Sequence, residues 1–398
     1  MDCPLCQRGA LVAFHDGGSV PLFVNVLHDD QKAARAVERG ALQLGVCTGC
    51  GFVHNVAFEP RRLDYAPGYE NSLHGSPTFD SWARAQATEL VARHHLQGAA
   101  AVDVGGGRGE FMERLIDAGT ARGLVVDPSA PDDALWNSRG PITIERRRFD
   151  AQDVSTDVGL VLSRHVFEHL HDPVPLAAAI VGAARRVGAG VYIEVPNGLF
   201  TLRDMGVWDL IYEHCSYFTP SALSQLLGRA GAADATLSEA FSGQFLAAEW
   251  RPGTERSIGF NTSGAQAAPV TPADVARLCD AFAREHRELV RTWSMALQGR
   301  SSRGVALWGA GSKGATFLNS VPGARAVVCA VDVNPLKHGK FVAGTGHPIV
   351  APQDLRGLGV DTLIVLNPAY AGEIEAMVQS LGLAAEILTV EVAREAST

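Results

Sequence analysis

The chain has 398 residues, of which 46% are hydrophobic and 19% charged, and its formal net charge is -9. This length is more than one hydrophobic core usually supports, so we expect two or three domains, and the apolar content excludes a wholly disordered chain. The acidic balance argues against nucleic acid as a partner, because a sequence-independent grip on phosphates needs a surplus of Lys and Arg.

The first residues lack the basic start and apolar core of a signal peptide. A membrane span needs about 18 consecutive apolar residues, and no such run is present in the sequence. We therefore expect a cytoplasmic protein with no membrane partner. The sequence leaves the oligomeric state undetermined.

The apolar pattern predicts an α/β chain in four segments. Residues 1–60 are rich in turn residues and are expected to form a small β module. Residues 61–250 alternate strand-length apolar runs with helical patterns, which is typical of a doubly wound parallel sheet. Residues 251–300 form a linker and a connecting helix, whose apolar stripe from Val275 to Leu297 predicts packing. Residues 301–398 repeat the α/β pattern in a smaller Rossmann-like module.

Two Cys-x-x-Cys pairs lie in the first segment, Cys3 with Cys6 and Cys47 with Cys50. In a reducing cytoplasm such pairs are more often metal ligands than disulfides. Four thiolates suit a tetrahedral zinc ion and leave no coordination position open for a substrate. The sequence therefore predicts a structural zinc site.

The first glycine turn follows a strand that ends in Asp103, and it passes through Gly105, Gly107 and Gly109 into a helix. Glycines at these positions let a ligand approach the backbone closely. The next strand ends in Asp127, whose carboxylate can accept hydrogen bonds from two ribose hydroxyls. Such an arrangement suits S-adenosylmethionine (SAM) or a nicotinamide dinucleotide.

The acidic residue on the strand, in Asp-x-Gly-x-Gly-x-Gly, resembles motif I of class I SAM-dependent methyltransferases and favours SAM over NAD. Asp150 and Ala151 match the adenine-contacting position of that fold, and Ser163 and His165 match the end of its fourth strand. The resemblance implies that these residues and the glycine turn form one cofactor site.

Titratable residues gather after the following strands, and they are His165, Glu168, His169, Glu194, Tyr212, Glu213 and His214. In a doubly wound sheet the carboxyl ends of the strands face the ligand, so we expect these side chains to converge. A buried hydrogen-bonded cluster that supports loops is the structural alternative. Cys215 lies in the same run, and we interpret it as a small packed thiol rather than a nucleophile.

A second glycine turn, from Gly309 to Gly314, opens the last segment and is followed by a strand ending in Asp332. Alone, this pattern predicts NAD binding, but the unit is short for a dinucleotide domain. We favour a wall on the substrate side, where Lys313 and the helix N-terminus can meet an anionic phosphate. Asn367 and Tyr370 follow a later strand and would face the same substrate.

Together these motifs span nearly the whole chain and resemble those of the three-module C-methyltransferases that act on nucleotide-linked deoxysugars. The resemblance implies an N-terminal zinc module, a central SAM domain and a C-terminal Rossmann-like module. It also implies that Glu213 and His214 belong to the active site, with His214 as general base. His169 matches a further active-site histidine of the family.

The chain departs from the family pattern in two places. The family's Tyr-Asp-Glu-His run is replaced here by Ile211-Tyr212-Glu213-His214, which moves the tyrosine by one position. The segment from Tyr65 to His74 lies where the family has an active-site tyrosine, but its sequence differs. These departures leave the identity of the substrate open.

Methyl transfer to carbon requires a base that removes a proton next to a carbonyl, and histidine suits this role because its pKa is near neutrality. We assign the step to His214, with Glu213 orienting the imidazole and Tyr212 or His169 donating a hydrogen bond to the enolate oxygen. The expected partner is a small, anionic substrate. Residues expected to bind it are Tyr69, His74, Glu194, Asn197, Tyr217, Lys313, Asn367 and Tyr370.

Two other functions fit the same residues. In the first, the enzyme still uses SAM but methylates oxygen or nitrogen, with His214 deprotonating the acceptor directly. In the second, the protein is a zinc scaffold that binds nucleotides without catalysis.

Overall fold

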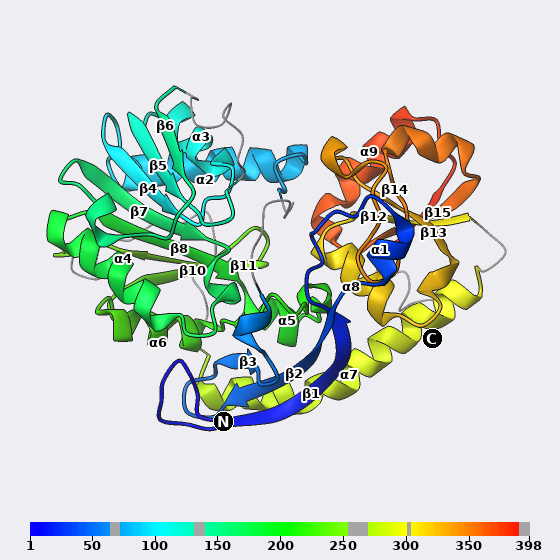
Figure 1. The fold of residues 1–398 in the computed structure, drawn as a ribbon, viewed down its shortest axis with the longest axis horizontal. Helices are drawn as coiled ribbons and strands as arrows, with labels where there is room; N and C mark the ends of the chain where they lie inside the picture. The colour runs from blue at the N-terminus through cyan, green and yellow to red at the C-terminus, as the bar shows by residue number, and fades with distance from the viewer. Residues whose placement is uncertain (64–71, 131–139, 254–269, 301–303, 390–398) are drawn as a thin grey trace.

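The computed structural model describes residues 1–63, 72–130, 140–253, 270–300 and 304–389. Figure 1 shows a large sheet and a smaller sheet standing side by side, with a third sheet and a long helix lying beneath both. The predicted α/β class, with two Rossmann-like units and a small β module, is confirmed. None of the helices in these ranges has the length and apolar character needed to cross a bilayer.

The N-terminal sheet has four antiparallel strands in the order β1-β2-β3-β9. Its strands are β1 Leu11–Pro21, β2 Arg39–Cys47, β3 Val53–Asn55 and β9 Ser216–Tyr217. The short helix α1 (Gln31–Arg35) lies between β1 and β2 in the chain. Strand β9 comes from a much later part of the chain and pairs with β3 at Val53↔Tyr217 and His54↔Ser216. The module predicted for residues 1–60 therefore takes in part of the later Tyr212–Phe218 segment.

The large sheet has seven strands in the order β10-β11-β8-β7-β4-β5-β6. Its strands are β4 Ala100–Val104, β5 Arg122–Val126, β6 Ile142–Glu145, β7 Val158–Arg164, β8 Gly190–Pro196, β10 Thr236–Ala240 and β11 Phe245–Trp250. All run parallel except β11, which is antiparallel to both of its neighbours. Every residue of β4 is buried, as expected for a central strand that is covered on both faces.

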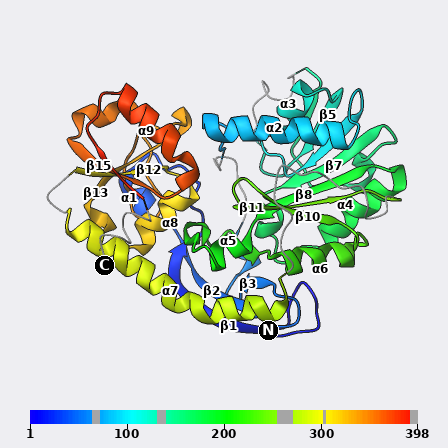
Figure 2. The same ribbon diagram turned by 180° about the vertical axis from the view of Figure 1, so that it is seen from behind.

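Helices flank the large sheet on both sides (Figure 2), and they are α2 Pro77–Arg93, α3 Glu110–Asp117, α4 Val174–Val187, α5 Gly198–Leu202 and α6 Pro220–Ala230. Local sequence explains their starts. Ser76 caps α2 and Thr219 caps α6, each with its hydroxyl accepting a hydrogen bond from a backbone N–H three residues on. The apolar faces of these helices then pack on strands that are buried on both sides.

The C-terminal sheet has five parallel strands in the order β14-β13-β12-β15-β16. Its strands are β12 Gly304–Trp308, β13 Val327–Val331, β14 Ile349–Val350, β15 Val360–Val365 and β16 Glu386–Leu388. Helix α8 (Ser312–Ser320) follows the second glycine turn, and α9 (Ala371–Ser380) follows β15. The predicted α/β repeat in the last segment is therefore present.

The long helix α7 (Pro272–Gln298) joins the N-terminal sheet to the C-terminal unit (Figures 1 and 2). Thr271 and Asp274 form a reciprocal capping box at its start. Near that end the ring of Phe282 contacts Phe14 of β1 at 5.9 Å between centroids. Further along, Trp293 meets Phe317 of α8 at 5.1 Å. The apolar stripe of this helix is therefore packing, as predicted.

The N-terminal sheet is in very close contact with the Tyr212 ring. A Cβ atom added at Gly40 in β2 would lie only 2.2 Å from that ring, and both residues are buried. Only glycine leaves room for the tyrosine at this point of the interface.

We therefore expect Gly40→Ala to lower the free energy of unfolding by about 1–3 kcal/mol, the usual cost of overpacking a buried site. The measurement is equilibrium urea unfolding followed by circular dichroism. Gly182→Ala in α4 is the control, because a Cβ there would meet nothing within 4 Å. Equal stabilities of Gly40→Ala and the unchanged chain would contradict the steric argument.

Candidate active site

Four cysteine thiols meet beside the turn between β2 and β3. The sulfurs of Cys3 and Cys50 are 3.7 Å apart, those of Cys6 and Cys47 are 3.6 Å apart, and all four lie within 4.8 Å of one another. A tetrahedral ion with metal–sulfur bonds of about 2.3 Å separates its ligands by about 3.8 Å. The spacing and the donor set are thus compatible with one zinc ion.

The first glycine turn follows β4, and its glycines adopt the left-handed backbone conformation that glycine tolerates. The φ angles of Gly105, Gly107 and Gly109 are +78°, +55° and +75°. A Cβ at Gly105 would lie 2.2 Å from the side chain of Val166, whereas a Cβ at Gly107 would meet nothing within 4 Å. The turn is therefore packed on one side and open at Gly107.

Two buried carboxylates accompany this turn. Oδ1 of Asp103 has no hydrogen-bond partner among the described residues, and burial raises the pKa of Asp103 to about 7. Asp127 is already engaged: its Oδ2 accepts from the Gly107 N–H at 2.8 Å, and its Oδ1 accepts from the Ser129 N–H at 2.7 Å. The predicted ribose acid therefore also braces the glycine turn.

The other predicted cofactor residues lie near the ends of strands. Asp150 is exposed and caps a 3-10 turn that begins at Ala151, accepting from the Gln152 N–H at 2.8 Å. Ser163 is fully buried in β7, and its hydroxyl donates to the carbonyl of Val104 at 2.9 Å. Ser163 thus joins β7 to the end of β4, and its contact with a cofactor stays a prediction.

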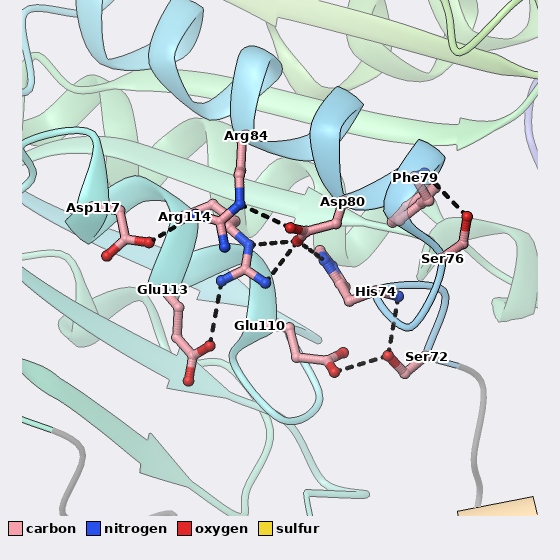
Figure 3. Close-up of polar contacts among 10 residues, drawn as sticks. All are labelled: Ser72, His74, Ser76, Phe79, Asp80, Arg84, Glu110, Glu113, Arg114 and Asp117. Carbon is pink, nitrogen blue, oxygen red and sulfur yellow. Dashed lines mark hydrogen bonds and ion pairs between the residues drawn. The ribbon is translucent and has the colours of Figure 1, made fainter. Parts of the chain in front are cut away.

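The segment that carries His74 is attached to the helix that follows the glycine turn (Figure 3). Ser72 donates to Glu110 of α3 at 2.8 Å, and His74 Nδ1 lies 3.4 Å from Asp80 of α2. Burial lowers the pKa of His74 to about 4, so its imidazole is neutral at pH 7. The contacts place His74 beside the predicted cofactor turn, while Tyr69 lies outside the described residues.

An ionic network occupies the ends of β7 and β8. Glu194 is fully buried, accepts hydrogen bonds from Arg164 Nε at 2.9 Å and from the Tyr192 hydroxyl at 2.5 Å, and forms an ion pair with His165 at 3.2 Å. Burial raises the pKa of Glu194, but Arg164 and His165 outweigh burial and hold it at about 2. Burial likewise lowers the pKa of His165, but Glu168 and Glu194 raise it to about 9. Glu194 is therefore an internal counter-ion for two cations, as in the structural alternative considered above.

Two further histidines, His169 and His214, lie close to this network, but unlike His165 they are neutral at pH 7. The rings of His169 and His214 are 4.9 Å apart, and one ring nitrogen of each lies within 4.8 Å of a carboxylate oxygen of Glu168. Burial lowers the pKa of both imidazoles to about 4. His169 Nδ1 lies 3.0 Å from the carbonyl oxygen of Glu213, so it carries the proton and leaves Nε2 with the lone pair.

The two residues before His214 face the N-terminal module. Glu213 is fully buried, and its Oε2 accepts from the Val24 N–H at 3.1 Å. The hydroxyl of Tyr212, also fully buried, accepts from the Glu59 N–H at 2.9 Å. Cys215 is a buried free thiol whose pKa is raised by burial to about 12, which fits the packing role predicted for it.

Two further predicted substrate residues support the backbone around the site. Asn197 caps α5 by accepting from the Leu199 N–H at 3.0 Å, and its amide donates to the carbonyl of Gly243 at 2.9 Å. Tyr217 lies in β9 near the backbone of Ile211, and burial raises the pKa of its hydroxyl well above the ordinary value. Tyr217 therefore keeps its proton and remains able to donate it in a hydrogen bond.

The second glycine turn is covered by other parts of the same chain. Lys313, at the start of α8, forms an ion pair with Asp209 of the 3-10 turn Val207–Asp209. The amide of Asn25, from the N-terminal module, donates to the hydroxyl of Ser312 at 2.9 Å. Lys313 thus faces the segment that leads to His214, which is the side predicted for the substrate.

The acid that would bind a ribose in a dinucleotide fold is also engaged. Asp332 Oδ2 accepts from the Ala310 N–H at 2.9 Å and pairs with Lys337 at 3.1 Å. These contacts use the carboxylate to hold the turn. They support a structural role for this unit over the NAD interpretation.

Asn367 and Tyr370 connect the C-terminal unit to the large sheet. Asn367 and Gln244 exchange two amide hydrogen bonds, of 3.0 Å and 2.9 Å, and the ring of Tyr370 lies 5.8 Å from that of Phe241. Both partners belong to the turn between β10 and β11. The two residues therefore join the units, and their contact with a substrate stays a prediction.

Sequence reasoning missed three participants. No role was predicted from the sequence for Arg164, Asp209 or Gln244. The one available signal was for Arg164, a cation directly before His165 at the end of a parallel strand. Asp209 and Gln244 acquire their partners only through folding, across 104 and 123 residues of chain respectively.

The arrangement offers three chemical functions in adjoining places. The glycine turn presents an open backbone surface above a buried carboxyl group. Next to it, His165 holds a positive charge between two glutamates. Beyond it, two neutral imidazoles border the carboxylate of Glu168 and can accept protons.

Known families match both halves of the chain. A methyltransferase domain matches residues 79–237, and a C-methyltransferase C-terminal domain matches residues 274–385. The C-methyltransferase NovU of Streptomyces niveus is 26% identical over 392 residues, which cover 94% of this chain and 91% of that protein.

Solved structures of methyltransferases with bound S-adenosylhomocysteine align with less than half of the chain. The Burkholderia thailandensis 1,6-didemethyltoxoflavin-N1-methyltransferase is 18% identical, with 44% of this chain and 79% of that chain covered and a TM-score of 0.32. The magnesium protoporphyrin IX methyltransferase of Synechocystis is 19% identical, with 44% and 83% covered and a TM-score of 0.33.

The charged state of His165 predicts a loss of stability in alkaline solution. Its folded pKa of about 9 lies above the ordinary value of 6.5, so its ion pairs stabilise the fold fully below pH 6.5 and are lost as the pH rises through 9. We expect His165→Asn, which suits the left-handed φ of +55°, to flatten the decline of the melting temperature between pH 6.5 and 9.5.

The control is His95→Asn, an exposed histidine with a similar φ of +54°. This variant should keep the wild-type pH slope. Parallel slopes for His165→Asn and the wild type would show that the imidazolium adds no stability.

Proposed function

Because the chain is a class I SAM-dependent methyltransferase of the C-methyltransferase family, we propose that it methylates a carbon next to the carbonyl of a keto sugar. The sugar is nucleotide-linked or phosphorylated, or the acceptor is a related small metabolite. The observation that carries this proposal is the pair of neutral imidazoles, His169 and His214, beside the buried carboxylate of Glu168. A carbon acid requires such a base, whereas SAM supplies only the methyl group.

The residues around the first glycine turn fit the cofactor. The open surface at Gly107 admits a ligand to the backbone, and Asp103 offers a buried carboxyl oxygen without a partner among the described residues. A ligand ammonium group would restore the charge of Asp103 and would offset its burial. Asp127 retains a lone pair on Oδ2 for one ribose hydroxyl, since that oxygen accepts one bond in the described structure.

His214 is the proposed base. Its low pKa keeps the imidazole unprotonated at pH 7, and a hydrogen bond to the backbone of Asp209 orients the ring. When the ring takes a proton from the substrate, the neighbouring carboxylate of Glu168 stabilises the imidazolium. Glu213 fixes the loop through the Val24 N–H, so it positions His214 through the backbone.

The structure favours Tyr217 over His169 and Tyr212 as the hydrogen-bond donor to the enolate oxygen. His169 Nε2 carries a lone pair when Nδ1 donates to Glu213, so neutral His169 suits a substrate hydroxyl rather than an enolate oxygen. Tyr212 accepts from Glu59 and is fully buried, which suits a positioning residue. Tyr217 retains its proton and is the better candidate for a donor.

An anionic substrate is supported by Lys313. Its ammonium group is partly exposed and pairs with Asp209. Lys313 lies in the first turn of helix α8, whose N-terminal N–H groups favour negative charge. A substrate phosphate would compete with Asp209 for Lys313. Because the Asp209 backbone is hydrogen-bonded to His214, substrate binding at Lys313 would alter the position or environment of the proposed base.

The proposal is tested by solvent exchange. In D2O, the enzyme with a nucleotide-linked keto sugar and S-adenosylhomocysteine should exchange the proton next to the carbonyl, as read by mass spectrometry. His214→Gln should lower both exchange and methyl transfer by about 100-fold or more, the usual contribution of a general base.

His171→Gln, which removes an imidazole two residues after His169 but outside the cluster, should keep both activities. Methyl transfer without exchange in the unchanged enzyme would point to an oxygen or nitrogen acceptor. Loss of methyl transfer with exchange intact in His214→Gln would remove His214 as the base.

We also propose that the four-cysteine cluster holds a structural zinc ion. The sulfur spacing fits a tetrahedral ion and all four thiols are buried, so the ion would have no open position and would take no part in catalysis. Its effect on the reaction would be indirect, through the β2–β3 turn.

Purified protein should contain one zinc per chain by inductively coupled plasma mass spectrometry. Cys47→Ala should lose the metal and melt at a lower temperature, because a structural zinc site contributes directly to folding. Cys279→Ala, which alters a buried thiol of α7 outside the cluster, should keep the metal. Less than about half an equivalent in the unchanged protein would contradict the assignment.

A further inference from the structure

We propose that Glu168, His169 and His214 also form a binding site for one divalent transition-metal cation, and that occupation of this site inhibits the enzyme. Binding of the cation follows from the donor atoms alone. Inhibition rests on the proposed function, because it requires that His214 is the base.

The donor atoms are already gathered. One ligand atom of each residue lies within 4.8 Å of the other two, and the two imidazole rings are inclined by 73° with centroids 4.9 Å apart. Metal bonds of about 2.0–2.2 Å would draw the three atoms closer, which small side-chain rotations can provide. Two histidines and one carboxylate are a donor set that zinc, cobalt and related cations bind well.

The environment of the Glu168 carboxylate suits the binding of such a cation. Glu168 is 2% exposed, and its Oε2 has no hydrogen-bond partner among the described residues, while its Oε1 lies 3.5 Å from His165. Leaving a buried carboxylate oxygen unpaired is costly. A cation at this position would satisfy it.

Backbone carbonyls orient both histidines, as in metal sites whose ligands are held by outer hydrogen bonds. His169 Nδ1 donates to the carbonyl of Glu213 at 3.0 Å, and His214 is hydrogen-bonded to the backbone of Asp209. Each of these bonds fixes one nitrogen as the donor, so the other nitrogen carries the lone pair that a metal needs.

The cations around the site are engaged by carboxylates. His165, Arg164 and Lys313 are paired with Glu194 and Asp209, and these carboxylates offset part of the repulsion between the three cations and an incoming metal ion. With three protein ligands, the metal would keep an open position that water or a substrate oxygen can take. Coordination would consume the lone pair of His214 and so would block proton abstraction.

The site differs in chemistry from the four-cysteine cluster, which allows both to be observed in one sample. Cobalt bound to thiolates gives intense sulfur-to-metal charge-transfer bands, whereas cobalt bound to nitrogen and oxygen gives only weak visible bands. The zinc-loaded full chain is therefore titrated with Co2+ and followed by calorimetry and visible spectroscopy.

One additional Co2+ per chain should bind without charge-transfer bands. Glu168→Gln and His169→Gln should each weaken this binding by about tenfold or more, since even outer-shell changes at metal sites cost that much. His171→Gln should bind as the unchanged chain does. Absence of an additional Co2+, or equal affinity in all four proteins, would overturn the site.

Inhibition is read separately as exchange of the substrate α-proton in D2O. Half-inhibition should occur at the Co2+ concentration that half-fills the additional site, and Glu168→Gln should require about tenfold more Co2+ for the same fractional loss of its own activity. Unchanged exchange at full occupancy would overturn the inhibitory role. Failure of the proposed function would instead appear as absence of exchange before any Co2+ is added, with binding intact.

Discussion

The pairing of β9 with β3 is the constraint on which the rest of the structure depends. It makes the segment that directly follows His214 part of the N-terminal sheet, at Val53↔Tyr217 and His54↔Ser216. The cysteine cluster closes the β2–β3 turn, and so the position of β3 depends on it. A metal bound there would act at a distance from the chemistry, by holding β3, which pairs with β9 just after the proposed base.

The same segment is held from its other side by the C-terminal unit. Trp208 contacts Phe317 of α8 at 5.1 Å, and Phe317 in turn contacts Trp293 of α7 at the same distance. Helix α7 then returns to the N-terminal sheet through Phe282. These aromatic contacts connect residues 207–218, the C-terminal unit, helix α7 and the N-terminal sheet. The C-terminal module thus contributes rigidity to the site as well as the cation Lys313.

The sequence alone predicted the elements that depend on local pattern. Apolar runs and glycine turns located both parallel sheets, because strand ends and tight turns are encoded by neighbouring residues. It did not predict what the glutamates would contact. Glu194 neutralises Arg164 and His165, and its contact with a substrate stays a prediction. The partner of Glu213 is Val24, 189 residues away. Such partners depend on how whole sheets meet, which no local spacing encodes.

Environment rather than residue type separates the histidines of this region. His165 and His169 are four positions apart, yet two carboxylates raise the pKa of His165 to about 9 and burial lowers that of His169 to about 4. A fixed cation beside neutral bases is the arrangement that enolate chemistry needs, since positive charge favours the enolate while a free lone pair takes the proton. Exchanging the two environments would leave the composition of the site unchanged but remove the charge arrangement on which the proposed function depends.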